Sequence, residues 1–148
     1  MKILIAEDDI TSAKILMKML SGYGKCDLAV DGVEAVEAFE YALDSRQPYD
    51  LVCLDIMMPR MDGQEVLRNI RVIEGLRGIT GLNGVKIMMT TALDDFRNIM
   101  KSFREQCESY LVKPIHRAKL ADELAKLGFH PAKRPPRRTI ARTETAQE

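Results

Sequence analysis

The sequence predicts an α/β fold in which a five-stranded parallel sheet is covered by helices on both faces. Five short apolar runs alternate along the chain with five longer stretches whose apolar residues recur at helical spacing. No tight two-residue hairpin signal joins one apolar run to the next. Strands that alternate with helices are connected by right-handed crossovers, so the predicted sheet is parallel and doubly wound.

The expected elements follow one another in strict alternation. Strands are predicted where β-branched and long aliphatic residues gather, because a parallel sheet is buried on both faces. These runs are Ile3–Ala6, Cys26–Val30, Leu51–Leu54, Val85–Met89 and Tyr110–Val112. Helices are predicted over the periodic stretches Ile10–Leu20, Val33–Leu43, Val66–Ile73, Phe96–Cys107 and Leu120–Leu127. Gly75–Gly84 holds four glycines in ten residues and is expected to form an extended loop before the fourth strand.

Length and charge indicate one domain with an appendage. The 148 residues suffice for one buried core, and the net charge is zero. The zero is a cancellation, because residues 1–129 carry 17 basic and 20 acidic residues while residues 130–148 carry five basic and two acidic ones. We therefore expect a domain over 1–129 and a basic, Pro- and Arg-rich, disordered tail over 130–148.

Composition excludes several classes of protein. Three widely spaced cysteines do not suit a disulfide framework or a zinc site, and they fit a reducing cytoplasm. No apolar run approaches the roughly 18–20 residues of a membrane span, so no membrane insertion is expected. The nine methionines are expected to fill the core, and Cys53, inside a buried strand, to be inert. Without Trp, the chain offers no stacking surface for single-stranded nucleic acid.

Polar residues follow four of the predicted strands, at the edge where a doubly wound sheet binds its ligand. They are Glu7-Asp8-Asp9, Asp55, Thr90-Thr91 and Lys113-Pro114. Carboxylates brought this close need a compensating cation, and hard oxygen ligands with open positions suit Mg²⁺. The ammonium of Lys113 would offset the acids and could pair with a phosphoryl oxygen.

Simpler interpretations stand beside these. Asp9 directly precedes a helix and is expected to be its N-cap. Lys113 could form an ordinary salt bridge to Asp55, and Thr91 alone would more often cap the next helix. Tyr110 could be a strand tyrosine packed at a sheet edge.

Four segments, KILIAEDD, LVCLDIMMPRMDG, MTTALDD and YLVKPI, resemble the receiver domain of two-component response regulators in order and spacing. The resemblance covers residues 1–129 and implies a flavodoxin-like (βα)5 fold with strand order 2-1-3-4-5. The chain is similar to stand-alone receivers of the chemotaxis-regulator kind. It implies a cytoplasmic signalling protein without a turnover substrate, which catalyses its own aspartyl phosphorylation from small phosphodonors and its dephosphorylation.

The same resemblance implies an acceptor and a metal site. Asp55 matches the phosphorylated aspartate. Asp8, Asp55 and the backbone carbonyl of Met57 match the ligands of Mg²⁺, with Mn²⁺ as an alternative ion. Glu7 matches the acid that acts through a metal-bound water.

Switch and structural residues are implied in the same way. Thr91 and Lys113 match the catalytic hydroxyl and ammonium, and Thr91 with Tyr110 matches the pair that changes conformation on phosphorylation. Lys113-Pro114 matches the cis peptide of the family.

Implied partners are a histidine kinase or histidine phosphotransfer protein, and a downstream protein bound through the fourth helix, fifth strand and fifth helix. The tail could contact nucleic acid. Both a monomer and a phosphorylation-dependent dimer remain open. The alternatives are a haloacid-dehalogenase-like aspartyl-phosphate phosphatase, which wants a second Asp where Met57 stands, and a phosphorylation-independent binding module.

Overall fold

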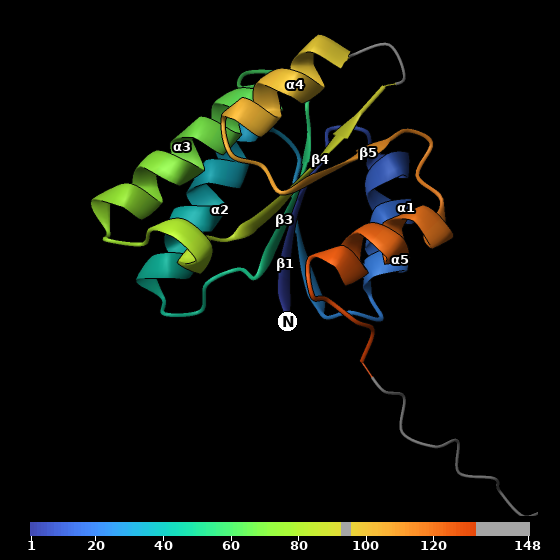
Figure 1. Ribbon diagram of the computed structural model, residues 1–148, viewed down its shortest axis with the longest axis horizontal. Helices are drawn as coiled ribbons and strands as arrows, with labels where there is room; N and C mark the ends of the chain where they lie inside the picture. The colour runs from blue at the N-terminus through green and yellow to red at the C-terminus, as the bar shows by residue number, and fades with distance from the viewer. Residues whose placement is uncertain (93–95, 133–148) are drawn as a thin grey trace, which may run out of the picture.

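A five-stranded parallel sheet forms the centre of the computed structural model, which describes residues 1–92 and 96–132 (Figure 1). Its strand order is β2-β1-β3-β4-β5, as the resemblance implies. The strands are β1 (Lys2–Ala6), β2 (Lys25–Ala29), β3 (Leu51–Asp55), β4 (Lys86–Thr91) and β5 (Ser109–Val112). All neighbouring strands run parallel. Their carboxyl ends therefore meet at one edge of the sheet.

Helices cover both faces of this sheet. They are α1 (Ile10–Leu20), α2 (Gly32–Asp44), α3 (Gly63–Leu76), α4 (Phe96–Arg104) and α5 (Arg117–Lys126). Figure 1 shows α2, α3 and α4 on one face and α1 with α5 on the other. Each face has its own apolar core, one around Phe39 and Ile70 and the other around Leu20 and Leu124. The sheet is thus a buried partition, and β3 at its centre is buried along its whole length.

Aspartates start three of the helices. Asp9, Asp31 and Asp62 precede α1, α2 and α3, and each side chain accepts a hydrogen bond from a backbone N–H of the first turn. The prediction that Asp9 is an N-cap is confirmed, at 3.1 Å from the Thr11 nitrogen. Because two of these caps follow a strand end closely, they also fix where the strand-to-helix loops turn.

The predicted boundaries need correction at three helices, of which α5 begins at Arg117, three residues earlier than expected. The helix α3 runs from Gly63 to Leu76, so it enters the glycine-rich stretch, and Gly81–Asn83 forms a short 3-10 helix, η1, instead of open loop. The sequence periodicity marked only the apolar part of α3 and missed its capped, polar first turn. The helix α4 ends at Arg104, three residues earlier than expected, and Gln106 adopts a left-handed backbone (φ 74°) that no helix continues through.

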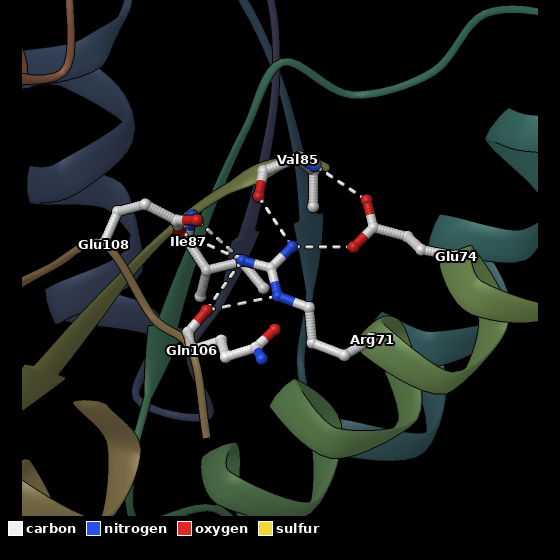
Figure 2. Close-up of polar contacts among 6 residues, drawn as sticks. All are labelled: Arg71, Glu74, Val85, Ile87, Gln106 and Glu108. Atoms are coloured by element: carbon white, nitrogen blue, oxygen red, sulfur yellow. Dashed lines mark hydrogen bonds and ion pairs between the residues drawn. The ribbon is translucent and has the colours of Figure 1, made fainter. Parts of the chain in front are cut away.

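Arg71 of α3 forms a polar network with residues before and at the start of β4 and before β5 (Figure 2). Its guanidinium lies 2.7 Å from Glu74 and 2.9 Å from Glu108, and it also donates to the carbonyls of Val85 and Gln106. The two glutamates in turn accept the backbone N–H groups that begin β4. Helix α3, the start of β4 and the loop before β5 are thereby joined in one polar network.

The chain leaves the domain after α5, where the Ala132 nitrogen donates to the Gly22 carbonyl at 2.8 Å. The rest of the predicted tail lies outside the described residues. Among residues 1–92 and 96–132, no helix has the length and apolar character of a membrane span.

Candidate functional site

Three carboxylates converge at the carboxyl edge of the sheet. Glu7 and Asp8 directly follow β1, and Asp55 is the last residue of β3, the strand that pairs with β1. Glu7, Asp8 and Asp55 each bring a carboxylate oxygen within 4.8 Å of the others. Glu7 and Asp55 are buried, whereas Asp8 is exposed. Parallel pairing of β1 with β3 therefore places the buried carboxylates of Glu7 and Asp55 beside the exposed carboxylate of Asp8.

Lys113 lies between the two buried acids. Its Nζ is 2.8 Å from a Glu7 oxygen and 3.1 Å from an Asp55 oxygen. The residue follows β5, and its backbone N–H donates to the Thr91 carbonyl at 2.7 Å, which anchors it to the end of β4. The Lys113–Pro114 peptide bond is cis. The salt bridge to Asp55 exists, and it is shared with Glu7.

The charges at this edge shift one another's protonation. Burial raises the pKa of Glu7 to about 7, and the neighbouring Asp55 carboxylate adds to the rise while Lys113 opposes it. Burial alone would lower the pKa of Lys113, but its hydrogen bonds to Glu7 and Asp55 raise it. Lys113 thus stays charged at neutral pH, where Glu7 is partly protonated.

Asp9 does not join the cluster. Its hydrogen bonds from the Ser12 hydroxyl and the Thr11 backbone hold its pKa below the usual value. It remains an ionised helix cap beside the site.

A tight loop leads from Asp55 into α3. The Ile56 nitrogen donates to the Thr90 carbonyl, and the Gly63 nitrogen donates back to Ile56 at 2.9 Å, so the base of the loop is closed. A Cβ at Gly63 would overlap the Asp55 carbonyl, which explains a glycine there. The Met57 side chain is 66% exposed, and its N–H donates to an Asp55 oxygen at 3.2 Å.

The donor atoms at this edge suit a hard divalent cation. All are carboxylate oxygens, from Glu7, Asp8 and Asp55, and no thiol or imidazole joins them among the described residues. These three carboxylates therefore fit Mg²⁺ by chemistry, and the backbone carbonyl of Met57 remains a predicted ligand.

The predicted switch residues Thr91 and Tyr110 lie on neighbouring strands, at the end of β4 and on edge strand β5. Thr91 is buried as the last residue of β4, and its hydroxyl donates to the Ala92 carbonyl at 3.2 Å. It does not cap α4, which starts five residues later. Tyr110 on edge strand β5 is 39% exposed and meets Phe103 of α4 edge to face, with ring centroids 5.5 Å apart. The ring therefore lies outside the fold, against α4.

Sequence reasoning missed a hollow next to Lys113. A cavity of about 410 Å³ is lined by polar and apolar side chains of α1 and the loop after β5. Its lining residues are Glu7, Ser12, Ile15, Leu16, Lys113, Pro114 and Ile115. The signal in the sequence was Ile15, an isoleucine on the outer side of α1 that is half exposed.

Burial tests two further expectations. Cys53 is buried, and burial raises the pKa of its thiol to about 12, so it is inert. For the methionines the prediction holds only in part: Met58, Met88 and Met89 are buried, and Met17, Met19 and Met61 are partly buried against the cores, whereas Met1, Met57 and Met100 are exposed.

A doubly wound sheet of order 2-1-3-4-5, with acids and a lysine at its carboxyl edge, defines a flavodoxin-like domain with a candidate phosphoryl site. The sequence model of the response regulator receiver domain matches residues 3–125. The chain belongs to this family and is a two-component signalling domain.

Relatives and solved structures agree with this assignment. The chain is 32% identical over 132 residues to "Probable histidine kinase 2" of Oryza sativa subsp. indica, covering 82% of this chain and only 12% of that protein. A chain in the CheX-CheY-BeF3-Mg+2 complex from Borrelia burgdorferi matches with TM-score 0.73 and 27% identity, over 86% of this chain and 88% of that one. The complex of Saccharomyces cerevisiae Ypd1, a histidine phosphotransfer protein, with the receiver domain of Ssk1 matches with TM-score 0.73 and 26% identity, over the same shares.

Proposed function

We propose that Asp55 accepts a phosphoryl group from the phosphohistidine of a histidine kinase or a histidine phosphotransfer protein. The observation that carries the proposal is the position of Lys113, whose ammonium reaches both Asp55 and Glu7 at the edge where three carboxylates converge. An ordinary salt bridge would need only one acid. The surplus of acid around one lysine leaves a place for a divalent cation and for phosphoryl oxygens.

The proposed transfer forms and breaks one bond each. An Asp55 carboxylate oxygen attacks phosphorus and forms the acyl phosphate, while the bond from phosphorus to the donor imidazole nitrogen breaks and its electron pair stays on that nitrogen. Lys113 holds the attacking carboxylate at 3.1 Å and can pair with a phosphoryl oxygen as charge builds there. The domain contributes position and charge rather than a proton relay.

Mg²⁺ would be held by Asp8, Asp55 and the Met57 backbone carbonyl, with Glu7 acting through a bound water. When bound, the ion supplies positive charge to the phosphoryl oxygens. Mn²⁺ has the same ligand preferences and could replace it.

The hollow beside Lys113 supports a place for the donor. Its apolar lining by Ile15, Leu16 and Ile115 lies next to the acceptor, and Ile10 at the start of α1 is also exposed. A donor helix that buries apolar side chains there would bring its histidine to Asp55. The matched Ssk1 receiver was solved with the phosphotransfer protein Ypd1, which agrees with a partner of this kind.

A switch from Thr91 to Tyr110 would report phosphorylation. The Thr91 hydroxyl donates to the neighbouring Ala92 carbonyl, and turning it toward phosphoryl oxygens would leave space for Tyr110 to fill. This would change the face formed by α4, β5 and α5, where a downstream protein would bind.

Thr91→Ala is expected to uncouple this switch while phosphorylation continues. Without the hydroxyl, the contact between residue 91 and the phosphoryl oxygens is lost, and phosphorylation no longer favours one conformation of Tyr110 over the other. Tyrosine ring signals followed by NMR should shift on phosphorylation of the wild type and shift much less in the variant. Full wild-type shifts in Thr91→Ala would refute the switch.

Intact-mass measurement tests the acceptor. After incubation with acetyl phosphate and Mg²⁺, the wild type should gain one phosphoryl mass and Asp55→Asn none. Asp62→Asn is the matched control, because it makes the same change in the same loop and asparagine also caps a helix. A phosphoryl adduct on Asp55→Asn, or none on the wild type, would overturn the assignment.

A further inference from the structure

The loop between β3 and α3 is held at its tip as well as at its base. Its base is closed by the Ile56–Gly63 hydrogen bond already described. At the tip, Arg60 Nε donates to the Asp31 carboxylate at 2.9 Å, and a second guanidinium nitrogen contacts the same oxygen. In sequence, Met57 lies between Ile56 at the base and Arg60 at the tip, and its backbone carbonyl is the proposed metal ligand.

Asp31 is a firm anchor for this contact. Its side chain is only 10% exposed and accepts the Glu34 N–H at 2.9 Å as the N-cap of α2. That backbone bond, followed by the bond from Arg60, holds the pKa of Asp31 below its usual value, so the carboxylate is charged. The pairing joins the start of α2 to the tip of an exposed loop.

The backbone at the tip of the loop has a conformation that is unfavourable without tertiary contacts. Arg60 has φ 64°, in the left-handed region that is unfavourable for a residue with a side chain. Next to it, a Cβ at Gly32 would overlap the Met61 carbonyl, so α2 and the loop tip approach as closely as a glycine permits. Two features of the sequence, a glycine at the start of α2 and an arginine paired to its cap, therefore serve the same contact.

We propose that the Arg60–Asp31 pair is a positioning latch that presets the acceptor loop for divalent cation binding. The proposal rests on the proposed function, because it assigns Met57 the carbonyl ligand. With the latch closed, the backbone between Asp55 and Arg60 is already ordered when Mg²⁺ arrives, and less ordering free energy opposes binding. Neither latch residue touches the ion.

Charge alone makes the opposite prediction for Arg60. Removing a cation near an acidic site should strengthen Mg²⁺ binding, whereas opening the latch should weaken it. Stability separates the latch from a merely structural contact, because Arg60→Gly relieves the left-handed backbone and should leave the thermal midpoint unchanged or higher.

The test is calorimetric titration of the full chain with MgCl₂ alone. Arg60→Gly is expected to bind Mg²⁺ about two- to fivefold more weakly, the range of a partly exposed ion pair. Asp31→Asn keeps a helix cap but loses the charge, and should weaken binding similarly. The double variant should be no weaker than the weaker single variant, because both changes open one contact.

Arg46→Gly is the matched control. Arg46 also has a left-handed backbone (φ 55°) and is exposed, but it lies after α2, outside the acceptor loop. Its variant should bind Mg²⁺ as the wild type does. Arg60→Gly binding Mg²⁺ as tightly as the wild type, or more tightly, would overturn the latch alone, while a wild type that binds no Mg²⁺ would overturn the proposed function and the latch together.

Discussion

Glu7 and Lys113 decide how charge is distributed at the acceptor edge. The ammonium bridges Glu7 and Asp55, and Glu7 still has its pKa raised to about 7 by burial. Near neutral pH the site can therefore hold or release a proton at Glu7. A divalent cation that bound there would favour the ionised form.

Glu7→Gln is expected to remove a pH dependence of stability. The pKa of Glu7 rises from 4.5 to about 7 on folding, so the native state favours the protonated acid. The stability this gives is complete below the unfolded pKa and is lost as pH rises through the folded one. Without Mg²⁺, the wild type should lose free energy of unfolding relative to Glu7→Gln between about pH 5 and about pH 7.5, as measured by urea titration. A constant difference across that range would contradict the raised pKa.

Sequence reasoning found the residues that follow strands and missed the ones that reach across the chain. Glu7, Asp8, Asp55 and Lys113 stand directly at predicted strand ends, so parallel pairing alone brings them together. Arg60 reaches an aspartate 29 residues away, and no local pattern encodes that contact. Loop geometry and a left-handed backbone on a non-glycine residue cannot be derived from apolar periodicity.

Among the elements, α3 is joined by arginine side chains to β4, to the loop before β5 and to the end of α4. Arg71 donates hydrogen bonds to Glu74 of its own helix, to Glu108 in the loop before β5, and to the carbonyl of Val85, which directly precedes β4 (Figure 2). Arg68 adds a second ion pair, to Glu105 after α4. The carboxyl end of α4 is therefore fastened to α3.

Arg71→Met is expected to lower the free energy of unfolding by about 3 kcal/mol, because Glu74 and Glu108 lose their shared cation while largely buried. Arg77→Met is the control. Arg77 pairs with Asp44 at 2.7 Å, but both side chains are exposed, so less than about 1 kcal/mol should be lost. Urea unfolding of both variants measures the difference, and equal losses would contradict the role of the network.

The strands were the easiest elements to predict and the helix ends the hardest. All five strands were located because a buried parallel strand is an unbroken apolar run. The start of α3 depends on a polar capping turn, and the end of α4 on the left-handed Gln106. These are properties of the packed structure and of single backbone angles.

At the scale of the whole molecule, the carboxyl ends and the amino ends of the strands carry different polar clusters. The carboxyl edge gathers Glu7, Asp8, Asp55 and Lys113, and the other edge carries the Arg71 network. β4 joins them, since it begins at the network and ends at Thr91. Under the proposed function, this division would let the acceptor loop and the β5 face change conformation while the opposite edge stays fixed.

The zero net charge also divides by region. Residues 1–129 have an excess of three acids, and the basic surplus lies beyond Phe129. Under the proposed function, the excess of acids would favour the approach of divalent cations and of basic partner surfaces to residues 1–129.

The most direct test of the account locates the phosphoryl bond itself. The protein is phosphorylated with acetyl phosphate and Mg²⁺, then reduced with borohydride, which converts an aspartyl phosphate into homoserine. Peptide mass spectrometry should find homoserine at position 55 and unmodified acids at positions 7, 8 and 9. Reduction at one of those three positions, with Asp55 unchanged, would contradict the account.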